Sequence, residues 1–309
     1  MPDDVPHPAA DRVSSADPVP FADLVPDPAA LERIATGSTW AEGPCWIPGT
    51  RTLRWSDIPG DRILQWHADT GVVDAYAEGV EFTNGRTLDR DGSVVQCSHG
   101  RRRVERDRDG TVTPVVDGWN GVRLNSPNDV VVARDGTVWF TDPAYGITQP
   151  REGHPGEREY GDHWVFACGP DGADLRPVAV DVDEPNGLAF DPSEQVLYVA
   201  SSSSDEPVIR AYDRAGVRLK NGRVFARLGP DEGVPDGIRV DVHGNVWSSS
   251  RGGVVVFDPT GARLGTIPVP ETVANLCFGG EDGTTLFLAA TTSVYRIPTT
   301  TTDGTAAVS

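Results

Sequence analysis

Six residues with short oxygen-bearing side chains recur along the chain, each at the start of a similar segment. These residues, called the repeat openers below, are Glu42, Asn84, Asn128, Asn186, Asp236 and Asn275. Two are carboxylates and four are amides, so the set offers oxygen donors only, without a thiolate or an imidazole. Such donors favour Ca²⁺, Mg²⁺ or Mn²⁺ over zinc. If the openers converge, they predict a site for a hard divalent cation.

The segments that follow the openers have the pattern of β-strands. They contain apolar runs separated by turn dipeptides such as Asp-Gly, and successive openers lie 42, 44, 58, 50 and 39 residues apart. A repeat of about 40 to 50 residues with strand patterning is typical of β-propeller blades. We therefore predict an all-β fold, a six-bladed β-propeller with four-stranded blades. In this fold each opener should face the central channel.

The sixth repeat is too short to form a complete blade. It ends with SVYRIPTT and lacks an outermost strand, which residues 31–37 (LERIATG) can supply. Pairing the two ends of the chain in one blade closes the ring and removes exposed strand edges. We predict a propeller over residues 29–298. A disordered, acidic and Pro-rich tail at 1–28 should precede it, and a disordered tail at 299–309 should follow.

Bulk composition excludes several kinds of partner. The 46 acidic against 27 basic residues give a net charge of −19, which would repel nucleic acids and anionic membranes. No apolar stretch approaches the roughly 20 residues of a membrane-spanning helix, and the N-terminus does not resemble a secretory signal. We expect a cytoplasmic monomer or weak homodimer that acts on a small molecule. The four cysteines form no CxxC pair and should be free, buried thiols: Cys45, Cys97, Cys168 and Cys277.

A simpler interpretation is that the Asn-Gly and Asp-Gly pairs only form turns. This interpretation explains one or two of the openers. It does not explain Glu42-Gly43-Pro44 or Asn128-Asp129, where a two-residue hairpin turn is not required. We therefore prefer the metal-site interpretation.

Five separated motifs carry a family resemblance. They are E-G-P at 42–44, N-S-P-N-D at 125–129, W-F-T-D-P-x-Y-G at 139–146, P-N-G-L at 185–188 and P-D-G-I at 235–238. From about Glu42 to Arg296 the chain resembles the gluconolactonase, senescence marker protein (regucalcin) and luciferin-regenerating enzyme family. The resemblance implies a metal-dependent hydrolase that opens a small, sugar-type lactone to the hydroxy acid.

The resemblance also implies a ligand set for one catalytic divalent cation. Glu42, Asn186 and Asp236 correspond to the family's metal ligands, and Asn128 corresponds to a channel Asn that contacts metal or substrate. Ca²⁺ is the favoured ion, with Zn²⁺, Mn²⁺ and Mg²⁺ as alternatives. Such a cation can polarise the lactone carbonyl and stabilise the oxyanion that forms.

Two residues are candidates for moving protons. Asp236 could accept the proton of an attacking water, although a carboxylate bound to a cation is a weak base and metal-bound water is an equal alternative. His99, at the end of the run QCSHG, could shuttle protons near neutral pH. The alternative for His99 is a structural histidine at a strand end.

The sequence predicts the residues that contact the substrate less specifically than it predicts the metal ligands. The candidates are Asn128, Asn84, Tyr145 and Arg123. Tyr145 could instead be a packing aromatic, and Asp142 is expected to be a turn residue or an indirect partner of the site. Some members of the family carry Arg where this chain has Ser126, so another group must take over any sugar contact made there.

An insertion in the third repeat, residues 143–163, could supply such a group through Arg151 or His154. An irregular segment of this length is usually a functional lid or disordered. The shorter insertion at 201–207 reads as a flexible turn.

Other functions remain compatible with this sequence. A phosphotriester hydrolase or a specialised pathway enzyme could use the same metal site. A non-catalytic propeller scaffold is a further alternative, because fold alone does not determine function.

Overall fold

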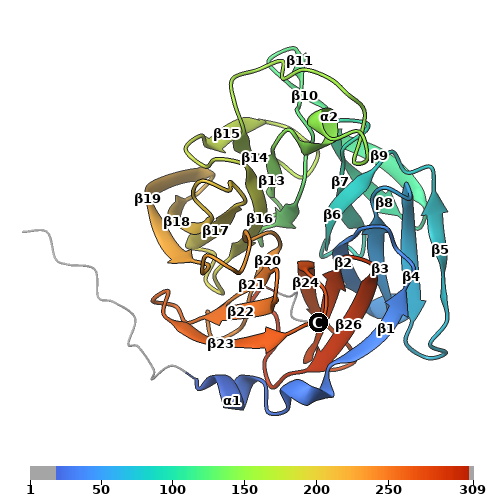
Figure 1. Ribbon diagram of the computed structural model, residues 1–309. Helices are drawn as coiled ribbons and strands as arrows, with labels where there is room; N and C mark the ends of the chain where they lie inside the picture. The colour runs from blue at the N-terminus through green and yellow to red at the C-terminus, as the bar shows by residue number, and fades with distance from the viewer. Residues whose placement is uncertain (1–18, 306–309) are drawn as a thin grey trace, which may run out of the picture.

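The computed structural model describes residues 19–305, which form a ring of antiparallel β-sheets (Figure 1). Six four-stranded sheets follow one another around the ring as blades, together with one two-stranded hairpin. The predicted six-bladed propeller is confirmed.

Within each blade the strands run from the channel outward. The strands of blade 1 are β2 (Ala41–Ile47), β3 (Thr52–Asp57), β4 (Arg62–His67) and β5 (Val73–Glu78). Those of blade 2 are β6 (Thr83–Leu88), β7 (Val94–Ser98), β8 (Arg103–Arg108) and β9 (Thr111–Val116). Those of blade 3 are β12 (Val130–Val132), β13 (Val138–Asp142), β14 (Trp164–Cys168) and β15 (Arg176–Ala179).

The second half of the ring is built in the same way. The strands of blade 4 are β16 (Pro185–Phe190), β17 (Val196–Ser201), β18 (Val208–Ala215) and β19 (Arg218–Arg227). Those of blade 5 are β20 (Ile238–Val240), β21 (Val246–Ser250), β22 (Gly253–Phe257) and β23 (Arg263–Pro268). Those of blade 6 are β24 (Val273–Gly279), β25 (Thr285–Ala290), β26 (Ser293–Pro298) and β1 (Glu32–Thr36).

Short elements complete the described chain. They are the helices α1 (Phe21–Leu24) and α2 (Tyr145–Thr148), the 3₁₀ turns η1 (Pro28–Ala30) and η2 (Pro48–Thr50), and the hairpin β10 (Gly118–Trp119) with β11 (Val122–Arg123). No helix among the described residues is long and apolar enough to cross a membrane.

The two ends of the chain meet in blade 6, as predicted. Strand β1 pairs antiparallel with β26, so that Glu32 lies opposite Arg296 and Thr36 opposite Ser293. The ordered fold extends beyond the predicted limits of 29 and 298. Leu24 is fully buried in the core of blades 5 and 6, and its carbonyl accepts a hydrogen bond from the Thr300 amide at 3.1 Å. The predicted tail segments 1–18 and 306–309 lie outside the described residues.

Aspartate side chains close many of the hairpins locally. Asp91 Oδ1 accepts from the Ser93 amide at 3.0 Å, and Asp135 Oδ1 accepts from the Thr137 amide at 3.0 Å. A short polar side chain that bonds the backbone two residues on mimics a turn. The recurrent Asp-Gly-Ser/Thr sequences therefore form the ends of hairpins, while the apolar residues around them form strands.

Large aromatic side chains fill the spaces between neighbouring blades. Trp46 of blade 1 stacks on Phe287 of blade 6 with ring centroids 5.5 Å apart, and Trp139 of blade 3 meets Phe190 of blade 4 edge-on at 5.4 Å. Burial of such rings is the main apolar contribution to blade packing. All four cysteines lie buried and unpaired in this packing, which confirms the prediction of free thiols.

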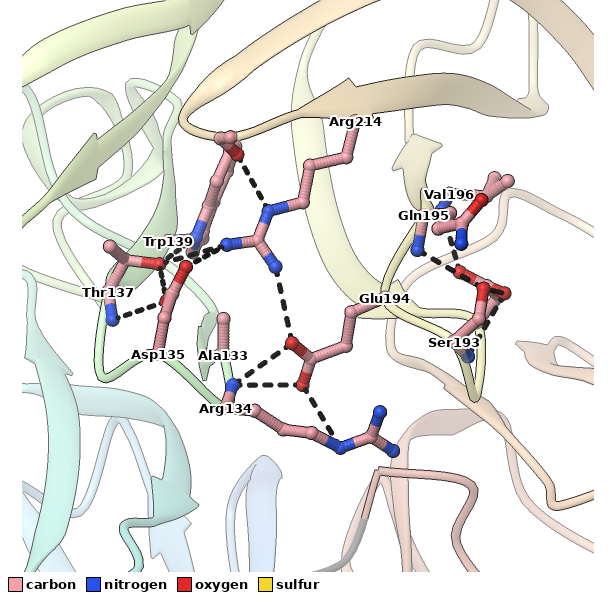
Figure 2. A network of polar contacts seen from close by, with 12 residues as sticks. Ala133, Arg134, Asp135, Thr137, Trp139, Ser193, Glu194, Gln195, Val196 and Arg214 are labelled. Atoms are coloured by element: carbon pink, nitrogen blue, oxygen red, sulfur yellow. Dashed lines mark hydrogen bonds and ion pairs between the residues drawn. The ribbon is translucent and has the colours of Figure 1, made fainter.

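A polar network joins blades 3 and 4 at the ends of their hairpins (Figure 2). The guanidinium of Arg214 donates to Glu194 at 3.2 Å and to Asp135 at 2.5 Å. Glu194 also accepts the backbone amide of Arg134 at 2.9 Å, so its carboxylate bridges two blades. The side chains of Arg214 and Glu194 are only 8% and 7% exposed. Each charge is therefore stabilised by the other.

We expect Arg214→Met to destabilise the protein by about 2 kcal/mol or more, because it leaves the buried Glu194 carboxylate with only the half-exposed Arg134 guanidinium, 3.9 Å away, as a counter-charge. Urea unfolding measures the change in free energy. Arg218→Met, at an exposed position of the adjacent strand β19, is the matched control and should change stability by less than about 0.5 kcal/mol. Equal effects of the two substitutions would show that the network does not join the blades energetically.

Candidate active site

Four of the six openers lie at irregularities in the innermost strands. The pairing of β2 shifts between Glu42 and Cys45, that of β6 between Thr83 and Arg86, that of β16 between Pro185 and Leu188, and that of β24 between Val273 and Asn275. A bulge bends a strand and redirects a side chain away from its regular alternation. These bulges position four of the openers at the channel end of their blades, whereas Asn128 and Asp236 lie just before β12 and β20.

The glycine after an opener allows neighbouring blades to approach closely. A Cβ on Gly187 would lie 2.3 Å from the carbonyl oxygen of Asp236, and one on Gly43 would lie 2.3 Å from that of Asn84. The Gly187 amide instead donates to the Asp236 carbonyl at 3.1 Å. The recurrent glycine thus serves contact between blades, and the simple turn interpretation is wrong at these positions.

Five of the six openers line one pocket of about 220 Å³, called the channel pocket below. They are Glu42, Asn84, Asn128, Asn186 and Asp236. Asn275 does not line it, although all six openers were predicted to face the channel. Its Nδ2 donates to Glu42 Oε2 at 3.0 Å, so Asn275 orients a pocket residue from behind.

The two carboxylates among the openers are electrostatically strained. Burial raises the pKa of Glu42 to about 7, with further contributions from the negative charges of Asp129 and Glu152. Burial also raises the pKa of Asp236 well above its usual value, and the Glu42 charge raises it further. Two buried carboxylates that disfavour each other's charge form a site that a cation would stabilise.

Asp142 braces the loop that carries Asn128. Its carboxylate accepts the backbone amides of Asn125 and Ser126, each at 2.8 Å, and the hydroxyl of Tyr160. Burial nevertheless raises the pKa of Asp142 to about 7. Asp142 therefore acts on the pocket indirectly, by holding this loop in place. The sequence alone suggests either this indirect role or a simple turn residue.

Several hydrogen bonds hold the insertion at 143–163 in place beside the channel. His99 Nδ1 lies 3.0 Å from the Glu152 carbonyl oxygen. Arg102, which is 5% exposed, donates to the carbonyls of Leu124 at 2.6 Å and Glu157 at 3.1 Å. As a result Gln149, Arg151 and Glu152 line the channel pocket together with the openers. Of the two alternatives given for the insertion, a lid or a disordered segment, this position favours the lid.

Glu152 is a pocket carboxylate that the sequence did not identify. Its side chain is 12% exposed, and its Oε1 lies 3.3 Å from Arg151 Nε. Burial raises the pKa of Glu152 while the Arg151 charge opposes that shift. Because the Glu152 charge in turn raises the pKa values of Glu42 and Asp236, the three carboxyl groups share one electrostatic environment. In the sequence, only the length of the insertion indicated that this segment could supply a pocket residue.

The remaining candidate residues occupy different positions. Tyr145 lines the pocket, and its hydroxyl lies 3.3 Å from Glu184 Oε2. Arg123 does not line the pocket: its side chain is 65% exposed and pairs with Glu159 at 2.6 Å. His154 likewise pairs with Glu81 at 2.8 Å near the surface. The predicted substrate contact by Arg123 therefore has no support in this arrangement, whereas Arg151 is well placed.

His99 is fully buried and does not line the channel pocket. In this arrangement His99 contacts the pocket indirectly, through Asn84 and the backbone of Glu152, which favours the structural alternative for this residue over direct proton transfer. Pocket residues outside the predicted set are Trp40, Ile58, Gln149, Glu152, Glu184, Ser202 and Val234. Of these, Ser202 lies in the short insertion that was expected to be only a flexible turn.

The donor chemistry of the pocket fits a hard cation. Within residues 19–305 no three His, Cys, Asp or Glu side chains converge to hold a metal ion, so a complete ligand set would need oxygen donors of other kinds, such as amides. The pocket supplies them beside two carboxylates, and Asn84 Oδ1 is buried without a hydrogen-bond partner. Carboxylate and amide oxygens are the ligands that Ca²⁺ prefers.

Comparison with known proteins gives concordant matches. Residues 40–292 match the family described as the SMP-30/gluconolactonase/LRE-like region. The gluconolactonase of Zymomonas mobilis is 35% identical, with 88% of this chain and 82% of that protein covered. The pentonolactonase of Haloferax volcanii is 30% identical, with 82% of each chain covered. The structure of a Xanthomonas campestris gluconolactonase aligns with a TM-score of 0.85 at 42% identity, covering 92% of this chain and 95% of that one.

Proposed function

Because this chain belongs to the SMP-30/gluconolactonase/LRE-like family, we propose that it is a divalent-metal-dependent lactonase that hydrolyses a small, sugar-type lactone to the hydroxy acid. The observation that carries the proposal is the channel pocket, where five openers from five blades converge. The gluconolactonase and pentonolactonase relatives, each at least 30% identical over most of both chains, support the same reaction class.

We assign the cation to Glu42, Asn186 and Asp236, with Asn128 as a further ligand or a substrate contact. Ca²⁺ is our first choice because the donors are all oxygens, and Mn²⁺, Mg²⁺ and Zn²⁺ are the alternatives. When bound there, a divalent cation supplies electrophilic polarisation of the lactone carbonyl.

The chain's own residues would hold the ring and accept a proton. Glu152 is better suited than Asp236 to take the proton of the attacking water, because it is a pocket carboxylate outside the ligand set. Its raised pKa brings it closer to the pH at which a base is effective. Arg151 and Asn84 are placed to bind polar groups of the ring. The insertion covers the pocket and limits the access of bulk water.

The first experiment follows acid release from D-glucono-1,5-lactone with a pH indicator. Metal-stripped protein should hydrolyse the lactone no faster than buffer, and added Ca²⁺, Mn²⁺, Mg²⁺ or Zn²⁺ should restore turnover to different extents. The order of restoration identifies the preferred ion. Full activity in metal-stripped protein would contradict metal dependence, and the absence of turnover on a panel of lactones with every ion would reject the lactonase proposal.

The other proposed properties rest on weaker observations. A net charge of −19 supports a small-molecule substrate over nucleic acid or anionic membrane. We propose a cytoplasmic monomer or weak homodimer. The comparisons do not favour a phosphotriester hydrolase, a specialised pathway enzyme or a non-catalytic scaffold, and the convergence of buried carboxylates in one pocket is not needed by a scaffold.

A further inference from the structure

Asn84 lines the channel pocket and has a buried side-chain oxygen, Oδ1, without a hydrogen-bond partner among the described residues. The residue is 4% exposed. Leaving a buried carbonyl unpaired costs about 1–3 kcal/mol. A ligand that donates a hydrogen bond to this oxygen would remove that cost.

His99 lies directly behind Asn84 and contacts its amide. His99 Nε2 is 3.3 Å from Asn84 Nδ2, and His99 Nδ1 is 3.0 Å from the carbonyl oxygen of Glu152 in the insertion. The imidazole is fully buried, and helix α2 packs so closely that a Cβ on Gly146 would lie 2.5 Å from His99 Cβ. The backbone of α2 therefore packs directly against the base of the His99 side chain.

The donors and acceptors in these contacts are compatible with one tautomer of His99 and one orientation of the Asn84 amide. A carbonyl oxygen can only accept, so Nδ1 of His99 must carry the proton that is donated to Glu152. Burial lowers the pKa of His99 to about 4, so the ring is neutral at pH 7 and Nε2 is an acceptor. An acceptor at Nε2 requires the NH₂ group of Asn84 to face it. The opposite amide orientation would bring two acceptors together.

We propose that His99 is a positioning residue that fixes the amide of Asn84, so that only the carbonyl oxygen faces the pocket and accepts a hydrogen bond from a hydroxyl group of the lactone ring. The inference rests on the proposed lactonase function. It makes the docked insertion part of substrate selection, because the Glu152 carbonyl determines which nitrogen of His99 is protonated. Lactones that carry ring hydroxyls are thereby selected over unsubstituted rings.

Two probe substrates isolate the contribution of the hydroxyls. D-Glucono-1,5-lactone and δ-valerolactone share the six-membered ring ester, but only the first carries hydroxyl groups. The ratio of their kcat/KM values measures discrimination by hydroxyl contacts. Asn84→Ala should lower this ratio about tenfold, because kcat/KM for gluconolactone falls about tenfold further than kcat/KM for δ-valerolactone.

Two substitutions of His99 separate its roles. His99→Gln can keep an acceptor near the position of Nε2, so it should retain the wild-type ratio. His99→Asn can keep the donor to Glu152 but lacks the acceptor, so it should lose about as much as Asn84→Ala. In the double variant with Asn84→Ala, His99→Asn should lower the ratio no further, as expected for residues that act as one unit.

The outcomes are distinct. A fall in the ratio with His99→Asn and Asn84→Ala, but not with His99→Gln, supports the proposal. Equal falls with Gln and Asn at position 99 would reduce His99 to a packing role and overturn it. Asn84→Ala leaves His99 in place, so an unchanged ratio in this variant overturns the proposal even if His99→Asn does not fold.

The cation is the other group that Asn84 Oδ1 could bind. Calorimetric titration with Ca²⁺ should give the same affinity in wild type and Asn84→Ala. A clear loss of affinity would make Asn84 a metal ligand and overturn the assignment to a hydroxyl. If wild-type protein hydrolyses neither lactone with any ion, the proposed function fails; if it hydrolyses both and Asn84→Ala leaves the ratio unchanged, only this inference fails.

Discussion

Asp236→Asn is expected to lower kcat/KM for D-glucono-1,5-lactone by about a thousandfold or more and to abolish the stabilisation of the fold by Ca²⁺. The substitution keeps the volume of the side chain but removes one of the two carboxylates assigned to the cation. Loss of electrophilic stabilisation at the reacting carbonyl accounts for a decrease of this size. Thermal unfolding with and without Ca²⁺ gives a second readout, because a ligand that binds only the folded state raises Tm.

The same substitution should stabilise the metal-free protein near neutral pH. A carboxyl group whose pKa is higher in the folded than in the unfolded chain lowers stability at pH values above its unfolded pKa, and Asp236 is such a group. The difference between Asp236→Asn and wild type should therefore grow as pH rises from about 4. It should vanish at lower pH, where Asp236 is protonated in both states.

Asp231→Asn is the matched control, since Asp231 is exposed and lies five positions earlier in the chain. It should change neither turnover nor the effect of Ca²⁺ on Tm. If Asp236→Asn kept the wild-type response to Ca²⁺, the cation would have to bind elsewhere and the ligand assignment would be wrong. A less stable metal-free variant would show that the two pocket carboxylates do not repel each other.

The repeat pattern was sufficient to predict the fold because each blade is a local structure. The strands of a blade are consecutive in sequence, and their Asp-Gly turns and apolar alternation are readable without tertiary information. Closure of the ring was predictable for a different reason: a sixth repeat without its last strand requires one from elsewhere, and β1 is that strand. The openers were found because the same type of residue recurs at the same point of every blade.

The remainder of the site depends on contacts between distant segments. Asn275 has the sequence features of an opener, yet its amide bonds to Glu42, 233 positions away. The role of His99 follows from its contact with Glu152, 53 positions away, which no repeat pattern encodes. Arg123 was a candidate to replace the arginine that some family members carry at the position of Ser126, but Glu159 holds it at the surface. The pairings of His99 and Arg123 depend on how the insertion docks, and that of Asn275 depends on how blades 6 and 1 meet. Both are visible only in three dimensions.

Glu152→Gln is expected to lower kcat about a hundredfold, since a positioned general base commonly contributes a factor of this size or more. Glutamine has nearly the same shape but cannot accept a proton. The wild-type rate should fall as pH falls through the raised pKa of Glu152, because the base must be deprotonated to act. That limb of the pH profile should disappear or shift in the variant, while the affinity for Ca²⁺ stays close to that of wild type.

Glu157→Gln provides the control within the same insertion, because Glu157 is exposed and does not line the channel pocket. The division of effects between kcat and KM then decides the role of Glu152. A lower kcat with the pH limb removed assigns proton transfer to Glu152 and leaves Asp236 as a ligand only. A higher KM with unchanged kcat would instead make Glu152 a substrate contact, since such a change reports binding that is equal in ground state and transition state. In that case Asp236 would again be the leading candidate for the base, despite its assignment as a metal ligand.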